Sequence, residues 1–172
     1  MSRAFVKEDT NAPPDLPDLP ISPHPNFVTP RGLALLQSAL AARQADLAAL
    51  RARADRLDKL PEAAAERDIR YLSARLASAI AVDPAQHDGS EVAFGLLVTV
   101  ADEDGDETTY QITGEDEADP AQGRIAPQSP LARALIGAAI GDTVTWRRPS
   151  GAVILEVIRI EQPTDPADDP RA

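Results

Sequence analysis

The feature that most constrains the fold is a leucine repeat in the first half of the chain. Residues 29–57 read TPRGLALLQSALAARQADLAALRARADRL. Taking Leu33 as heptad position a, the a and d positions hold Leu33, Leu36, Leu40, Arg43, Leu47, Leu50, Ala54 and Leu57. A stripe this narrow is typical of a helix that packs against one partner helix. Thr29 followed by Pro30 is a pairing that caps and starts a helix, so we expect the helix to begin here.

A second apolar stripe follows and supplies the partner. Pro61 suits the first turn of a new helix, and Ile69, Leu72, Leu76 and Ala79 repeat with the same three-four spacing. Only three or four residues would separate the two helices, so the arms must run antiparallel. The pattern predicts an antiparallel coiled-coil hairpin over residues 29–82.

Beyond Asp83-Pro84 the periodicity changes to that of strands. EVAFGLLVTVADEDGDETTYQITG is two apolar, β-branched runs around an acidic turn, which is typical of a hairpin. A short RIAP strand follows, then SPLARALIG as a helix with Ser129 as N-cap and Gly137 at its end. DTVTWRRPSGAVILEVIRI is a second hairpin. Residues 83–162 therefore predict a small antiparallel sheet domain with one short helix, and the whole chain is α+β.

The two ends of the chain differ from these segments in composition. Seven of the sixteen prolines lie within residues 11–30, where little apolar pattern is visible. We expect residues 1–28 to form an extended, mobile arm and residues 163–172 a flexible acidic tail. Within the arm, LPDLPISP (residues 16–23) leaves open a second interpretation, that of a docking peptide.

Composition and charge exclude several classes of function. The chain has no cysteine, only two histidines, and 3% aromatic residues. We therefore expect no metal or cofactor of its own and no aromatic-lined ligand pocket. The net charge of −11 disfavours duplex DNA, so nucleic acid could be contacted only locally, by the basic segment 29–82. No apolar run reaches the ~20 residues of a membrane span and no signal peptide is visible, so a cytoplasmic protein is expected.

The second half of the chain carries a family resemblance. YQITGEDEAD followed by GRIAPQSPLARALIGAAIGDTVTW and PSGAVILEVIRI resembles the C-terminal domain of the Gre transcription elongation factors, GreA and GreB. The TPRG start before a helical hairpin is similar to that family as well. The resemblance implies an FKBP-like domain that docks on RNA polymerase beside its secondary channel. It also implies a hairpin that points toward the polymerase active site.

The resemblance assigns docking to a set of residues that also have a purely local interpretation. The residues in the docking region are Asp116, Glu117, Ser129, Pro130 and Arg133. From the residues alone, the acidic loop could be only a solvated turn, and Ser129-Pro130 only a helix cap. The FKBP-like label does not imply prolyl isomerase activity, because fold similarity does not carry a catalytic site with it.

In transcript-cleavage members of the family, carboxylates at the hairpin tip help the polymerase hold a second Mg²⁺. Oxygen ligands are what this cation requires. The candidates here are Asp58, Glu62 and Glu66. They depart from the family motif in spacing, in the inserted Pro61 and in the alanines that replace its Asn and Tyr. Without a metal, Glu62 would complement the helix dipole and Glu66 could pair with Arg70.

Basic residues cluster around the same end of the hairpin. They are Arg51, Arg53, Arg56, Lys59, Arg67 and Arg70. They could contact nascent RNA or acidic polymerase surfaces, or they could be only the solvated exterior of a coiled coil.

The sequence thus favours an accessory factor of RNA polymerase that is not itself an enzyme and that at most stimulates RNA cleavage by the polymerase, through the Mg²⁺ of the polymerase. Two alternatives stay open. One is a non-cleaving regulator, similar to the Rnk proteins, that competes with other secondary-channel factors. The other is an adaptor whose coiled coil serves oligomerisation.

Overall fold

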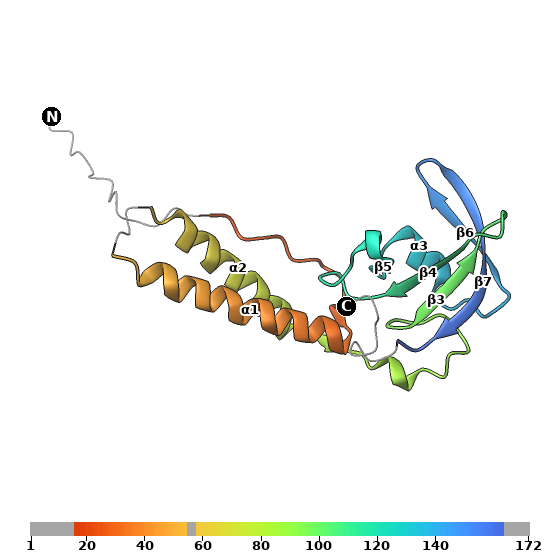
Figure 1. Cartoon of the computed structure of the whole chain (residues 1–172), viewed down its shortest axis with the longest axis horizontal. Coiled ribbons are helices and arrows are strands. Elements are labelled where there is room, and N and C mark those ends of the chain that lie inside the picture. Colours follow the sequence, from red (N-terminus) through yellow and green to blue (C-terminus); the bar gives the residue numbers. More distant parts are fainter. Residues whose placement is uncertain (1–15, 55–57, 164–172) are drawn as a thin grey trace, which may run out of the picture.

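The computed structural model of the chain describes residues 16–54 and 58–163 and has two parts, a long helix pair and a curled sheet (Figure 1). The helices extend to one side of the sheet, and their far end is the turn that joins them. The α+β class predicted from the sequence is confirmed. Within the described residues, no helix is long and apolar enough to span a bilayer.

The helix pair consists of α1 (Pro30–Arg51) and α2 (Leu60–Ala77). Thr29 caps α1 as predicted, because its Oγ1 accepts a hydrogen bond of 2.9 Å from the Gly32 N–H. Pro61 lies in the first turn of α2, also as predicted. Leu36 is buried, and the Arg43 interruption is exposed. The other described leucines of the stripe are half-buried, namely Leu33, Leu40, Leu47 and Leu50.

Both helices are shorter than the leucine pattern predicts. The first helix ends at Arg51, so eight residues, 52–59, connect the helices instead of three or four. Ala54, the next a position, is exposed and offers only a methyl group to bury, which is too little to hold a charged helix end. The predicted d position Leu57 lies outside the described residues. The second helix ends at Ala77 because the backbone beyond it pairs with another segment.

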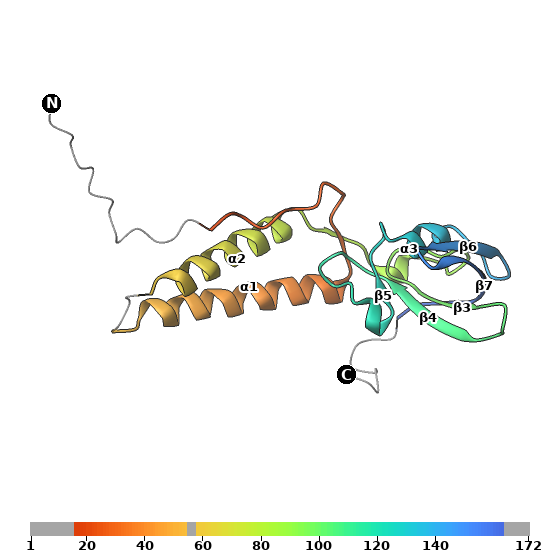
Figure 2. The ribbon, with the colours of Figure 1, turned by 90° about the horizontal axis from the view of Figure 1, so that it is seen from above.

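That segment is the proline-rich arm before α1. The strands β1 (Phe27–Val28) and β2 (Ile80–Ala81) form a parallel pair, in which the Ile80 N–H donates to the Asn26 carbonyl at 2.8 Å. Residues 16–25 run back along the helix pair (Figure 2). Asp18 forms an ion pair of 2.8 Å with Arg70, and Leu19 lies over a shallow groove between the helices. Residues 1–15 of the predicted mobile arm, like residues 164–172 of the predicted tail, lie outside the described residues.

The main sheet has five strands in the order β5-β4-β3-β7-β6. They are β3 (Leu97–Ala101), β4 (Glu107–Ile112), β5 (Arg124–Ile125), β6 (Thr143–Arg148) and β7 (Gly151–Glu161). The two predicted hairpins, β3–β4 and β6–β7, are confirmed. The sheet is mixed and not wholly antiparallel, because β5 returns through the short 3-10 helix η2 (Pro120–Gln122) and pairs parallel with β4. A second 3-10 helix, η1 (Pro84–Gln86), follows the helix pair.

A β-bulge explains the apolar spacing of β7. Val100 pairs with Val157 while the neighbouring Thr99 pairs with Arg159, so Ile158 is the extra residue. The bulge shifts the alternation by one position, and Val157 and Ile160 both point into the core.

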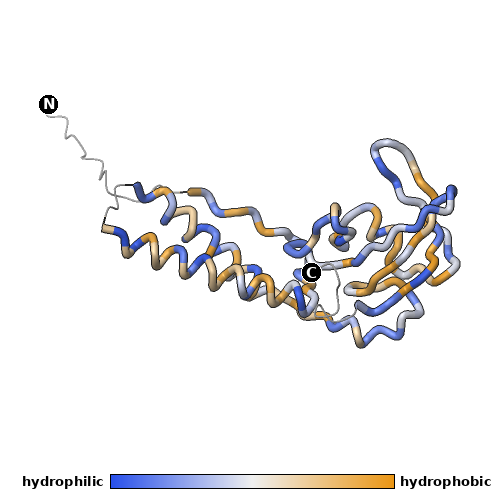
Figure 3. The backbone as a smooth tube through the Cα atoms, viewed as in Figure 1, coloured by the Kyte–Doolittle hydropathy of each residue, from blue (hydrophilic) through white to orange (hydrophobic). Residues whose placement is uncertain are grey.

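The core lies on one side of this sheet, beneath α3 (Pro130–Leu135). Ser129 caps that helix as predicted, accepting from the Ala132 N–H at 3.2 Å. Leu131, Ala132 and Leu135 of the helix pack on apolar residues of the central strands. Figure 3 shows the apolar residues gathered along those strands and repeating along the helices. The loop before β5 lies beside the base of the helix pair, and α3 lies beyond β5 (Figure 1).

Candidate functional site: the junction, the tip and the first turn of α3

The sheet and the helix pair meet at a polar junction, which we define as residues 26–32, Tyr71, Arg75 and the loop 114–119. One half of the junction surrounds Glu117, which is only 7% exposed. Thr29 Oγ1 donates to Glu117 Oε2 at 2.6 Å, and Arg31 Nη1 lies 3.9 Å from Glu117 Oε1. The same Thr29 side chain that caps α1 therefore fixes the helix to the loop of the sheet.

Two glycines allow this close approach. A Cβ on Gly32 would lie 2.7 Å from Glu117 Oε2, and a Cβ on Gly114 would lie 2.6 Å from the Phe27 carbonyl oxygen. No real side chain tolerates such contacts without a shift of its neighbours. The TPRG and GEDE motifs, 82 positions apart from Gly32 to Gly114, are thus in direct contact in the folded chain.

The other half of the junction surrounds Arg75, whose side chain is 2% exposed. Its Nε lies 2.6 Å from Asp116 Oδ2 and its Nη2 lies 3.5 Å from Glu115 Oε2. The Tyr71 hydroxyl donates to the other oxygen of Asp116 at 2.6 Å. Asn26 Nδ2 donates to the Arg75 carbonyl at 2.7 Å, which ties the arm to the same point. A buried cation with this many partners resists any change in the orientation of α2.

These contacts give the acidic loop a role inside the chain that sequence reasoning missed. Asp116 and Glu117, expected to face a partner, hold the helix pair against the sheet. Arg75 and Tyr71 were not singled out from the sequence, because an arginine and a tyrosine in a polar helix carry no mark of burial. The one available signal was the excess of carboxylates in the loop, which calls for a compensating cation somewhere in the chain.

The environment of Tyr71 makes a pH-dependent prediction. Burial, together with the hydrogen bond to Asp116, raises the pKa of Tyr71 to about 12. The ordinary value, which holds in the unfolded chain, is about 10. The folded state therefore keeps its proton where the unfolded state has lost it, and stability falls as pH rises from about 10 to about 12.

Tyr71→Phe should lower the free energy of unfolding by about 1 kcal/mol below pH 10. Between pH 10 and 12 the difference between wild type and variant should shrink, since only the wild type loses stability from this ionisation. Urea unfolding of both proteins at a series of pH values measures this difference. All other titrating groups are the same in the two proteins, so their contributions cancel. A difference that stays constant up to pH 12 would contradict the assigned environment.

The tip lies at the opposite end of the helix pair from the junction (Figure 1). Of the three candidate carboxylates, Asp58 is exposed, and its Oδ1 accepts from the Leu60 N–H at 2.9 Å. Glu62 is 7% exposed, and Glu66 forms an ion pair of 2.6 Å with Arg51 across the two helices. The expected pairing of Glu66 with Arg70 is wrong, because Arg51 of the facing helix is closer than a neighbour on the same helix.

The predicted basic patch is largely engaged within the chain. Arg51 pairs with Glu66, Arg67 with Asp68 and Arg70 with Asp18. Arg53 is exposed and Lys59 is half-buried, while Arg56 lies outside the described residues. Among the described residues, no three His, Cys, Asp or Glu side chains are grouped so that they could hold a metal ion.

The remaining predicted docking residues form a small surface on the first turn of α3. Ser129 is half-buried and caps the helix, while Pro130 and Arg133 are exposed. The structure therefore separates the predicted residues into three places: the junction, the tip and this turn.

A helix pair held in a fixed orientation to a small, curled sheet defines the molecule as a two-part α+β protein in which the helices extend from the sheet domain. The family described as "Transcription elongation factor, GreA/GreB, C-term" matches residues 86–162. Residues 86–162 therefore form a C-terminal domain of the GreA/GreB transcription elongation factor type.

Relatives named GreA agree with this assignment. The transcription elongation factor GreA of Hyphomonas neptunium is 50% identical over 93 residues, covering 54% of this chain and 59% of the relative. GreA of Anaeromyxobacter sp. is 49% identical over 83 residues, covering 48% of this chain and 50% of the relative. The chain thus spans between half and three-fifths of the length of these curated relatives.

Among solved structures, the GreA factor homolog 1 (Gfh1) protein of Thermus thermophilus aligns with 80% of this chain and 99% of its own. The sequence identity is 21% and the TM-score is 0.39. A TM-score this low establishes no common overall arrangement of the two parts.

Proposed function

We propose that the chain is an RNA polymerase-binding regulator of transcription elongation, of the Gre type. The C-terminal domain docks beside the secondary channel, and the helix pair enters the channel with its tip toward the active site. The observation that carries the proposal is the match of residues 86–162 to the Gre C-terminal domain, joined to a helix pair with a buried, charged junction. The chain acts as an accessory factor and the polymerase supplies the chemistry.

The junction supports this function because docking and insertion need a fixed geometry between the two parts. Docking places only the sheet domain. The direction in which the tip points is then set by the contacts of Arg75 and Glu117. In this proposal Asp116 and Glu117 position the helix pair, while Pro130 and Arg133 supply exposed contacts to the polymerase.

The tip favours a regulator that does not stimulate transcript cleavage. Holding a metal ion shared with the polymerase requires accessible carboxylate oxygens. Only Asp58 is exposed among the three candidates, and Glu66 is already paired with an arginine. The proposed mode of action is therefore occupation of the channel in competition with other secondary-channel factors.

The docking proposal predicts an effect of Arg133→Glu. The variant should bind core RNA polymerase at least about tenfold more weakly than the wild type, because a reversed charge in an interface costs more than 1.4 kcal/mol. Fluorescence anisotropy of labelled protein at moderate salt measures the dissociation constant. Arg147→Glu, a charge reversal at another exposed arginine, on β6, is the matched control and should stay within about twofold. Failure of the wild-type chain to bind polymerase would refute the docking proposal.

Cleavage is tested separately on stalled, backtracked elongation complexes. The chain should not speed up shortening of the RNA, and at saturation it should inhibit a cleavage-competent Gre factor. Faster shortening that is lost on Asp58→Ala would instead establish a cleavage factor with an active tip. A competitor that keeps its full activity would exclude occupation of the channel.

A further inference from the structure

A cavity of about 320 Å³ opens on the core side of the sheet, and we call it the acidic trough. The strands β3, β4, β6 and β7 line it, and α3 contributes no lining residue. Its floor is apolar and aromatic and consists of Val100, Tyr110, Trp146, Val153 and Leu155. The low aromatic content predicted no aromatic-lined pocket. The sheet nevertheless brings one of the two tyrosines together with the single tryptophan at this cavity.

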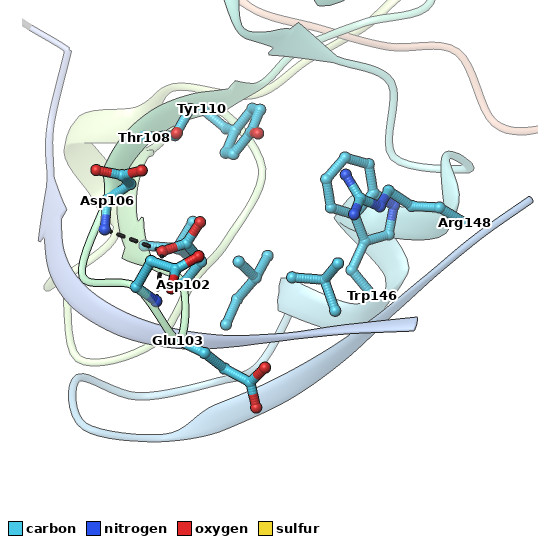
Figure 4. Close-up of a pocket in the computed structure, with 11 residues that line it drawn as sticks. Asp102, Glu103, Asp106, Thr108, Tyr110, Trp146 and Arg148 are labelled. Atoms are coloured by element: carbon cyan, nitrogen blue, oxygen red, sulfur yellow. Dashed lines mark hydrogen bonds between the residues drawn. The ribbon is translucent and has the colours of Figure 1, made fainter. Parts of the chain in front are cut away.

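One rim of the trough is the acidic β3–β4 turn. Asp102 Oδ1 accepts from the backbone N–H groups of Asp104 and Asp106, at 3.0 and 2.9 Å, so this carboxylate shapes the turn itself. Figure 4 shows Asp102 and Asp106 on the side of the trough opposite Trp146, while the Glu103 carboxylate points away. Among the described residues, no lysine, arginine or histidine nitrogen forms a salt bridge with Asp102, Glu103, Asp104 or Asp106, whereas the next residue, Glu107, lies 3.8 Å from Arg159. The turn differs in this from the loop 114–119, whose carboxylates pair with arginines from other parts of the chain.

On the opposite rim the aromatic floor already holds a guanidinium of the chain itself. Arg148 lies over the Trp146 ring, with its Cζ 4.9 Å from the ring centroid. Such a contact is favourable because the ring face is electron-rich. Four carboxylates and one arginine line the trough, so its net charge is negative. The electrostatic potential therefore favours binding of a further cation and disfavours binding of nucleic acid.

An edge strand beside the trough favours an extended peptide as the ligand. The strand β6 carries both Trp146 and Arg148 and is an edge strand of the sheet. An edge strand offers backbone groups to which another strand can add, and side chains of such a peptide alternate between two faces. The volume of the trough suits one or two side chains.

We propose that the acidic trough binds an extended segment of a partner protein, with an arginine or lysine next to an apolar side chain. The apolar side chain contacts the floor between Val100 and Leu155. The cation lies beside the carboxylate of Asp106, across the trough from Trp146 and Arg148. This site is separate from the first turn of α3 and does not depend on the proposed polymerase docking.

Trp146 provides a direct readout, because it is the only tryptophan of the chain. The probe is the capped peptide acetyl-Leu-Arg-Leu-Arg-amide, and the matched controls carry glutamine or glutamate in place of arginine. Titration of the full chain with the arginine peptide should give a saturable change in tryptophan fluorescence that weakens with added salt. Equal binding of the glutamine peptide, or no saturable change up to several millimolar, would overturn the proposal.

Two variants of the same turn test the position of the cation. Asp106→Asn should raise the dissociation constant of the arginine peptide by about threefold or more, since an exposed charge contact is worth up to about 1 kcal/mol. Glu103→Gln removes the same charge from a side chain that points away and should change binding less. Thermal unfolding of each variant confirms that the fold is retained. Equal weakening by both variants would reduce the trough to a nonspecific acidic surface and overturn the assigned site.

Discussion

Replacing Arg75 with methionine is expected to lower the free energy of unfolding by about 3 kcal/mol. The arginine is 2% exposed and its Nε lies 2.6 Å from Asp116. Methionine fills most of the volume but leaves Asp116 and Glu115 without their cation. Asp116 then keeps only the Tyr71 hydroxyl as a partner among these contacts. Removal of one partner from a buried ion pair is costly mainly because the other partner stays behind.

Urea unfolding followed by circular dichroism at 222 nm measures this loss, since that signal reports chiefly the helices. Arg159→Met is the matched control. Arg159 also contacts two carboxylates, Glu107 and Glu161, but all three side chains are about half exposed, so the loss should stay below about 1 kcal/mol. Equal losses in the two variants would contradict a buried, stabilising role for Arg75.

A double variant separates the pair from its surroundings. The double variant Arg75→Met/Asp116→Asn should lose much less free energy of unfolding than the sum of the two single losses. The reason is that Asp116→Asn removes the charge that Arg75→Met leaves without its partner. Additive losses would mean that the two side chains do not act as a pair.

Polymerase binding by the same variants connects the junction to the proposed function. The dissociation constant should change little, while competition with a cleavage-competent Gre factor should weaken, because docking is retained and the direction of the tip is lost.

Leu135→Ala should destabilise the sheet domain by about 3 kcal/mol. Leu135 is 0% exposed and lies in the core beneath α3, where truncation removes apolar contacts and leaves a cavity. The adjacent Ile136 is 46% exposed, so Ile136→Ala should cost less than about 1 kcal/mol. Urea unfolding followed by Trp146 fluorescence measures both variants. Similar losses at the two neighbouring positions would show that α3 does not cover the core in this register.

Several features of the fold were predictable because they depend on local patterns. Thr29-Pro30 and Ser129-Pro130 cap helices through contacts within three residues, and the structure has both caps. The β-branched runs around the DEDGDE and PSG turns form hairpins as predicted. The end of α1 was not predictable in the same way, since heptad counting gives Ala54 the same weight as a leucine, although its methyl group buries little surface.

The contacts of the charged candidate residues depend on residues that are distant in the sequence. Glu66 was a candidate metal ligand through the family resemblance, yet in the fold it faces Arg51 of the other helix. Glu117 looked like part of a solvated loop, yet it is buried against Thr29. The local sequence predicts neither contact, because each contact joins residues from different elements.

The sequence by itself determined the elements of this protein: two leucine-striped helices, two hairpins, a short capped helix, and a C-terminal domain that resembles the Gre factors. Those features follow from periodicity, capping and turn chemistry, which act over a few residues. Only the tertiary structure decided that the TPRG and GEDE motifs meet, that Arg75 is buried between them, and that Trp146 and the acidic turn enclose one trough. The physical reason is that burial and charge pairing are properties of the surfaces that elements present to one another, and those surfaces exist only once the chain is folded.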